Sequence, residues 1–113
     1  MNKDYTVFLK HILESIESIE EYVKDISEED FLKSQEKQDA VVRRLEIIGE
    51  AVRNLPDDFK EQYPDIAWNK AMGTRNILIH NYFGIDLRIV WDTVTKSLSE
   101  FKEQIKEVLK TSS

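Results

Sequence analysis

The sequence predicts an all-α protein, folded as an up-and-down four-helix bundle with short extra helices. Apolar residues recur every three or four positions along most of the chain, and no alternating, strand-like pattern runs for long. Only three glycines and two prolines interrupt this pattern. The expected long helices are joined by connections of a few residues, which favours antiparallel neighbours in a bundle.

The first helix is expected from about Lys3 to Lys24. Its apolar positions share one face of a helix: Val7 or Phe8, Ile12, Ile16, Ile19 and Val23. Glutamates occupy the other face, which we interpret as solvated: Glu14, Glu17, Glu20 and Glu21. His11 borders the apolar face, and we interpret it as a packed or half-exposed side chain rather than a ligand.

Two short helical links are expected between the long helices. The first, SEEDF, begins at Ser27, which together with Asp30 suits an N-terminal cap. The second, PDDFKEQYP, opens at Pro56, where the preceding helix ends, and closes at Pro64.

The second long helix is expected from about Glu36 to Asn54. One apolar stripe follows helical spacing: Val41, Leu45, Ile48, Val52 and Leu55. A neighbouring stripe widens it: Ala40, Ile47 and Ala51. Gly49 costs about 1 kcal/mol relative to Ala in a helix interior, which close approach of another helix would explain. Glu50 is open to two interpretations, a solvated rim residue or a carboxylate that faces a site.

The remaining two helices flank Gly84. Asp65 is expected to cap the third helix, and Gly84 suits the left-handed position after its end. Asp86 can cap the last helix, and fraying is expected from Thr111 onward. The last helix keeps a heptad-like apolar rhythm: Leu87, Val90 or Trp91, Val94, Leu98, Phe101, Ile105 and Val108.

Length and composition fit one helical domain over residues 1–113. The chain is long enough to bury a core, and 41% hydrophobic against 34% charged residues is typical of a folded, water-soluble chain. There is no cysteine, so neither disulfides nor thiolate chemistry are available. The first ten residues, MNKDYTVFLK, lack the apolar run of a signal peptide, so we expect a cytoplasmic protein with no membrane contact.

The net charge of −6 opposes nucleic-acid binding at first sight, because contacts to phosphate supply much of that affinity. Residues 1–36, however, hold four lysines and ten carboxylates, while residues 37–113 hold twelve charges of each sign. The acidity therefore belongs to the first third of the chain, and a small positive site elsewhere remains compatible with an RNA partner.

The stretch AWNKAMGTRNILIHNYFGID holds the least expected residues. If it is helical, Arg75 lies within an apolar stripe, where a guanidinium is costly unless it is paired or meets an anion. His80 lies about 140° around the helix from Arg75. One helix cannot easily direct both side chains at one atom. Either the helix breaks near Asn81, or a second copy of the chain supplies the missing half.

Several kinds of site are excluded by the sequence. Two histidines with no cysteine do not suit a zinc site, and no glycine-rich loop precedes a helix. No serine or cysteine has the support that a nucleophile needs. We therefore expect neither a metal nor a cofactor.

What remains is an Arg-x4-His-x-Tyr motif. Arg75 can bind a phosphate and stay charged, and His80 can exchange protons near neutral pH. Tyr82 adds a hydroxyl and a face on which a base can stack, and Asn76 could orient the imidazole or bind the phosphate. This set suits cleavage of RNA by its own 2′-hydroxyl, which needs no metal.

These residues resemble the HEPN superfamily, and specifically the HepT-like toxins that pair with minimal nucleotidyltransferase (MntA-like) antitoxins. Four segments carry the resemblance: RNILIHNYFGID at Arg75–Asp86, LEIIGEA at Leu45–Ala51, YPDIAW at Tyr63–Trp68 and IVW at Ile89–Trp91. The resemblance implies a HEPN-like, all-helical, two-fold homodimer whose two motifs face each other across a cleft.

The resemblance also implies a function, that of a metal-independent endoribonuclease toxin of a type II toxin–antitoxin system. Its substrate would be RNA, with tRNA as one candidate. Arg75 and His80 would be the catalytic residues, with Asn76 in support. Tyr82 would support the site and receive the AMP with which the antitoxin silences the toxin.

Two alternatives remain open at this point. The chain could be a non-catalytic helical partner, or a substrate-presenting subunit, of a nucleotidyltransferase, with Arg75 on nucleotide phosphates. It could also be a purely structural bundle in which Arg75 forms an ion pair. Expression without a partner should halt cell growth only if the chain is a toxin.

Overall fold

The computed structural model describes residues 5–72 and 86–112, and the regular structure within these ranges is helical throughout. The helices are α1 (Thr6–Val23), α2 (Glu28–Lys33), α3 (Gln35–Asn54), α4 (Asp57–Glu61), α6 (Leu87–Asp92), the π-helical segment η2 (Thr93–Ser97) and α7 (Leu98–Ser112). Residues 68–72 are helical as well. The prediction of an all-α fold is confirmed.

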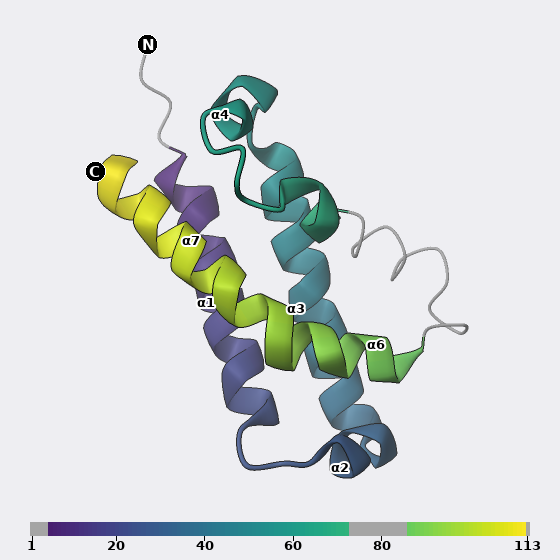
Figure 1. Cartoon of the computed structure of the whole chain (residues 1–113). Coiled ribbons are helices and arrows are strands. Elements are labelled where there is room, and N and C mark those ends of the chain that lie inside the picture. The colour runs from purple at the N-terminus through teal and green to yellow at the C-terminus, as the bar shows by residue number, and fades with distance from the viewer. Residues whose placement is uncertain (1–4, 73–85, 113) are drawn as a thin grey trace.

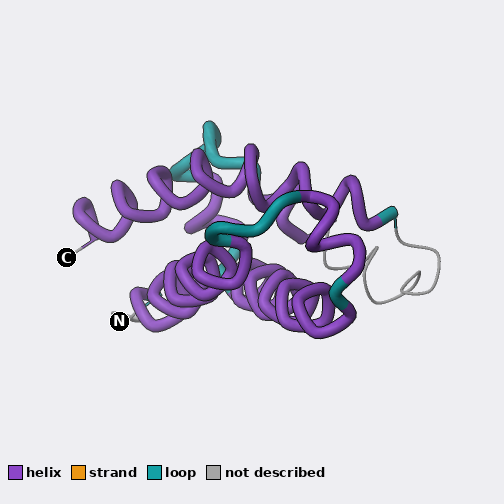
Figure 2. Tube along the Cα trace, turned by 90° about the horizontal axis from the view of Figure 1, so that it is seen from below, coloured by secondary structure: helices purple, strands orange, loops and turns teal. Residues whose placement is uncertain are grey.

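The long helices form two layers. Figure 1 shows α1 and α3 running antiparallel beside each other, with α6, η2 and α7 as one continuous helix that crosses them. Figure 2 shows α1 and α3 in one layer and the last helix in the other. Residues 68–72 and α6 lie on the side of α3 that faces away from α1 (Figure 1).

The core fills the space between these layers. The predicted stripe of α3 is buried along its length, as are Leu9, Ile12, Ile16 and Ile19 of α1. Of the two candidates at the start of α1, Val7 is 49% exposed, whereas Phe8 packs against the core. The last helix contributes a buried row to the same core: Val90, Val94, Leu98, Phe101, Ile105 and Val108. Gly49 is buried in α3.

Two predicted helix caps are confirmed. Ser27 Oγ accepts a hydrogen bond from the Asp30 amide at 3.0 Å, and Asp30 Oδ2 accepts one from the Ser27 amide at 3.2 Å. Asp86 Oδ1 accepts a hydrogen bond from the Arg88 amide at 2.9 Å. Ser34 caps α3 in the same manner, which the sequence analysis did not foresee.

The prediction that Asp65 caps the third helix was wrong. That helix begins at Trp68, and the carbonyl of Ala67 accepts the first helical hydrogen bond, from the Ala71 amide at 3.2 Å. A tight turn, with the Trp68 amide bonded to the Ile66 carbonyl at 2.9 Å, separates Asp65 from the helix start. The carbonyl of Asp65 instead accepts a hydrogen bond from Gln104 at 3.2 Å.

Other boundaries differ slightly from expectation. α1 begins at Thr6 rather than near Lys3, and α3 begins at Gln35. α7 runs to Ser112 rather than fraying from Thr111 onward. The Thr111 hydroxyl lies 3.3 Å from the hydroxyl of Tyr63, a contact between distant parts of the chain that helps to hold this last turn.

Candidate active site

The four predicted site residues, Arg75, Asn76, His80 and Tyr82, lie outside the described residues, and so does Gly84. The structure therefore describes the elements on either side of the motif and not the motif itself. The arrangement of Arg75 relative to His80 stays a prediction.

The helix that leads into the motif is anchored by Trp68. This side chain is buried, and its indole Nε1 donates to the carbonyls of Lys60 and Tyr63, each at 3.2 Å. Its ring also meets Phe101 of α7 edge to face, with the centroids 6.1 Å apart. The indole N–H is thus satisfied on burial, and the start of this helix is joined to α4, to the link after α4 and to α7.

The helix that follows the motif is held by a cap at its start and by an aromatic contact. Asp86 caps α6, and the ring of Trp91 packs against the fully buried ring of Phe31 in α2, with the centroids 5.4 Å apart. Arg88 is exposed on the first turn of α6, and Lys70 is exposed on the helix before the motif. An exposed cationic residue therefore lies on each side of the motif in the sequence, Lys70 before it and Arg88 after it.

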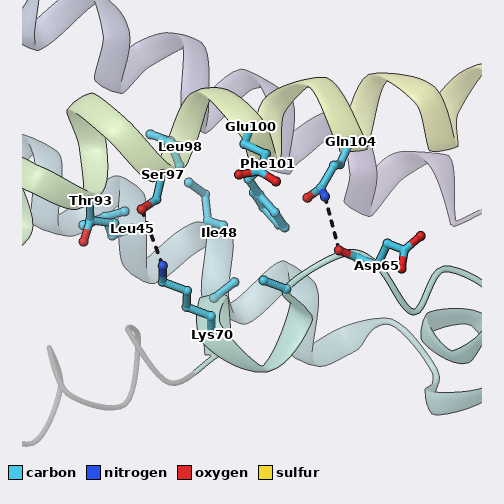
Figure 3. A pocket seen from close by; sticks show the side chains of 12 residues that line it. Leu45, Ile48, Asp65, Lys70, Thr93, Ser97, Leu98, Glu100, Phe101 and Gln104 are labelled. Carbon is cyan, nitrogen blue, oxygen red and sulfur yellow. Dashed lines mark hydrogen bonds between the residues drawn. The ribbon is translucent and has the colours of Figure 1, made fainter.

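A cavity of about 150 Å³ lies beside the helix that leads into the motif. Three elements enclose it: α3, the segment 65–71, and the last helix from η2 into α7 (Figure 3). Apolar residues form part of its lining: Leu45, Ile48, Ala67, Ala71, Leu98 and Phe101. Its rim is polar: Asp65, Lys70, Thr93, Ser97, Glu100 and Gln104.

Two hydrogen bonds bridge the rim, one on each side of Phe101 (Figure 3). Lys70 Nζ donates to Ser97 Oγ at 3.5 Å, and Gln104 Nε2 donates to the carbonyl of Asp65 at 3.2 Å. The carboxylate of Asp65 points away from Gln104 (Figure 3). The charged residues that line the cavity are Asp65, Lys70 and Glu100.

The polar rim was not predicted from the sequence, although the sequence carries a signal for it. Thr93, Ser97, Glu100 and Gln104 follow one another at intervals of four, three and four residues. This spacing places them on one helix face, directly beside the buried row of the last helix. A polar stripe at helical spacing is ordinarily a solvated face, so only the elements packed around it mark it as a site.

His11 and Glu50 lie elsewhere. Both are exposed, and both line an open groove between α1 and α3, together with Arg43 and Glu46. Within residues 5–72 and 86–112, no three histidine, cysteine, aspartate or glutamate side chains are grouped so that they could hold a metal ion. Over the same residues, no helix combines the length and the apolar character needed to cross a membrane.

Comparison with known proteins connects the chain to one family. The model of a family described as "Ribonuclease HepT-like" matches residues 12–108. The "Probable ribonuclease HepT" of Thermococcus cleftensis is 43% identical over 110 residues, which cover 97% of this chain and all of the relative. The "Putative RNase" of Caldanaerobacter subterraneus is 48% identical over 102 residues, 90% of this chain and 91% of the relative.

A third relative is longer than the chain. The "Gamma-glutamylcyclotransferase and putative RNase" of Methanocaldococcus jannaschii is 51% identical over 109 residues. The matched region covers 96% of this chain and 49% of that relative. No solved structure matches the chain.

Proposed function

Because the chain belongs to the HepT-like ribonuclease family, we propose that it is an endoribonuclease that cleaves RNA through Arg75 and His80. The observation that carries the proposal is the Arg-x4-His-x-Tyr motif of residues 75–82 in a chain of this family. The anchored helices on both sides of the motif support it, because a catalytic segment needs fixed ends to hold its groups in place.

The proposed reaction is an attack by the RNA's own 2′-hydroxyl on the adjacent phosphorus. His80 takes the 2′ proton as general base, and the guanidinium of Arg75 stabilises the negative charge of the pentacovalent phosphorane. The bond from phosphorus to the 5′-oxygen then breaks, and that oxygen takes a proton from solvent. The products are a 2′,3′-cyclic phosphate and a 5′-hydroxyl, and no metal takes part.

The test is cleavage of total RNA by the purified protein in the presence of a metal chelator, with analysis of the product ends. His80→Ala should slow cleavage by about 10²- to 10⁴-fold, the usual size of a general acid–base contribution. Arg75→Ala should act in the same direction. His11→Ala is the matched control, because it removes the chain's other histidine from an exposed position on α1.

Equal cleavage by the wild type and His80→Ala would rule out this mechanism. Loss of activity in His11→Ala to the same degree would show that removing any histidine perturbs the protein. If the wild type cleaves nothing and its expression leaves growth unaffected, the ribonuclease proposal fails, and the two alternatives are a non-catalytic partner of a nucleotidyltransferase and a purely structural bundle.

The proposal extends to regulation. The chain would be the toxin of a type II toxin–antitoxin pair in the cytoplasm, held inactive when its nucleotidyltransferase partner attaches AMP to Tyr82. The added phosphodiester would place a negative charge where the RNA phosphate must bind, besides filling the site. In the same growth assay, active nucleotidyltransferase should rescue cells that express the wild type and fail to rescue cells that express Tyr82→Phe.

The proposal includes an assembly. Residues 1–113 would act as one helical domain and pair with a second copy about a two-fold axis. In that dimer, Arg75 of one protomer and His80 of its partner would contribute to one site. In one helix, Arg75 and His80 would point about 140° apart and could not easily reach the same atom. A dimer avoids this difficulty because the two groups come from different protomers.

A further inference from the structure

The cavity beside residues 67–71 is a described feature that the proposed reaction does not use. Four buried side chains line it: Leu45, Ile48, Leu98 and Phe101. Its volume of about 150 Å³ is below the roughly 300–1,000 Å³ of pockets that hold drug-sized ligands. An occupant would therefore be small, on the scale of one ring system.

The rim offers both donors and acceptors. The Ser97 hydroxyl accepts from Lys70 and keeps its own O–H to donate. Thr93 donates its O–H to the Ile89 carbonyl at 2.9 Å, which leaves its oxygen as an acceptor. Gln104 uses its amide nitrogen on Asp65 and keeps its side-chain oxygen. Such a rim can pair with an occupant whose edge carries both kinds of group.

The charge of the rim decides between a phosphate and a neutral ring. The lining holds one cationic residue, Lys70, and two acidic ones, Asp65 and Glu100, and a carboxylate at the opening would repel a phosphate. Phosphate sites in nucleic-acid-binding proteins instead gather Lys, Arg and backbone N–H groups. The cavity therefore favours an occupant that is neutral, flat and apolar on its faces, with hydrogen-bonding groups along its edge.

We propose that this cavity receives one unpaired nucleobase of the RNA substrate, with an exocyclic amino group directed at the carboxylate of Glu100. Proteins read unpaired bases through apolar or aromatic contact with the ring faces and hydrogen bonds to the edge. Lys70 precedes Arg75 by only five positions in the sequence, so the bound base and the scissile phosphate would belong to one strand. This inference rests on the proposed function.

The test compares RNA oligonucleotides that differ at one unpaired position near the cut. The wild type should have a KM at least about fivefold lower for adenine or cytosine there than for uracil, because only the first two carry the amino group. Glu100→Gln should remove most of that preference. Ala71→Phe should fill the cavity and raise KM about tenfold for every oligonucleotide, with kcat unchanged because the catalytic groups remain.

Two further variants make this test decisive. Lys96→Ala removes an exposed lysine that is one residue from Ser97 but does not line the cavity, so its KM should match the wild type. If Ala71→Phe does not fold, Ala67→Phe fills the cavity from an exposed position on its wall. Unchanged KM and unchanged base preference in Glu100→Gln and in the filled variant would overturn the inference.

A binding experiment separates this inference from the proposed function. Adenosine titrated into the wild type should shift the amide NMR signals of residues around the cavity, such as Ser97 and Phe101, and uridine should shift them less. The filled variant should show neither effect. Adenosine binding without RNA cleavage would support the base site and contradict the ribonuclease proposal. RNA cleavage without adenosine-induced shifts at the cavity would support the ribonuclease proposal and contradict the base site.

Discussion

At the scale of single residues, the ion pair between Lys102 and Glu20 joins the two layers of the molecule. Lys102 Nζ of α7 lies 2.7 Å from Glu20 Oε1 of α1. Pairs such as Lys33–Glu29 connect neighbours on one helix, whereas this one connects residues on two different helices, 82 positions apart in the sequence. The hydrogen bond to Glu20 raises the pKa of Lys102 above its usual value, although desolvation of the ammonium works in the opposite direction.

Lys102→Met should lower the free energy of unfolding by at most about 1 kcal/mol at pH 7, since the Glu20 carboxylate is partly exposed and water screens the pair. The pKa of Lys102 is higher in the folded state than in the unfolded state. Its contribution is therefore complete below the ordinary lysine pKa of about 10.4 and disappears as pH rises through the folded pKa. Urea unfolding of wild type and variant between pH 7 and 11.5 checks this.

The control for this measurement is Lys106→Met. Lys106 is also on α7, and its pair with Glu103 at 3.5 Å stays within that helix. A gap between wild type and Lys102→Met that stays constant up to pH 11.5 would show that lost packing, and not the ion pair, destabilises the variant. If Lys106→Met lowers the free energy of unfolding by the same amount as Lys102→Met, the ion pair between the layers contributes no more than a pair within one helix.

At the scale of elements, the last helix shows what apolar spacing predicts and what it misses. Val90, Val94 and Leu98 are all buried, but eight residues turn an α-helix about 80° beyond two full turns. The segment η2 absorbs this excess, because the Leu98 amide reaches back five residues to the Thr93 carbonyl. The heptad-like rhythm predicted the buried face correctly. The two consecutive four-residue intervals, from Val90 to Val94 and from Val94 to Leu98, are the sequence feature that corresponds to the π-helical segment.

Deletion of Thr95 should therefore be tolerated. Removing one residue from the π-helical segment lets the helix continue with ordinary α geometry while the residues on both sides keep their faces, so we expect a loss of at most about 2 kcal/mol. Deletion of Ser99, in the regular part of the helix, should instead rotate the flanks by about 100° relative to each other. Several buried side chains, each worth roughly 1.5–3 kcal/mol, would then leave the core.

Circular dichroism and urea unfolding distinguish the two deletions. The expected outcome is a folded Thr95 deletion with a cooperative transition and a Ser99 deletion that does not fold. Equal loss of stability in both would mean that η2 is not an inserted residue within an otherwise regular helix. The Thr95 deletion should also disturb the cavity, because Thr93 and Ser97 both line it from this segment.

At the scale of the whole molecule, α3 lies between the acidic face of α1 and the flanks of the motif. Glu14, Glu17 and Glu21 are exposed on α1, whereas residues 68–72 and α6 lie on the far side of α3 (Figure 1). The net charge of −6 therefore need not oppose RNA binding near Lys70 and Arg88.

Helices, buried stripes and local caps were predictable because each depends on neighbours in the sequence. The cavity was not, because Ile48, Lys70 and Ser97 reach it from three elements far apart along the chain. Asp65 failed as a predicted cap for a related reason. Aspartate is a good capping residue and Asp65 lies only three positions before Trp68, but the turn through Ile66 and Ala67 sets the start of the helix.

If the site is shared between two protomers, two inactive variants should complement each other when they are mixed. Arg75→Ala and His80→Ala should each be inactive alone, but mixing them under conditions that exchange subunits should restore cleavage. In a mixed dimer, one site would pair the intact Arg75 of one protomer with the intact His80 of its partner, while the other site would lack both. At equal concentrations half of the dimers are mixed, so activity should recover to about a quarter of the wild-type value. If both groups of a site come from one protomer, every site in the mixture lacks one of them and no cleavage should return.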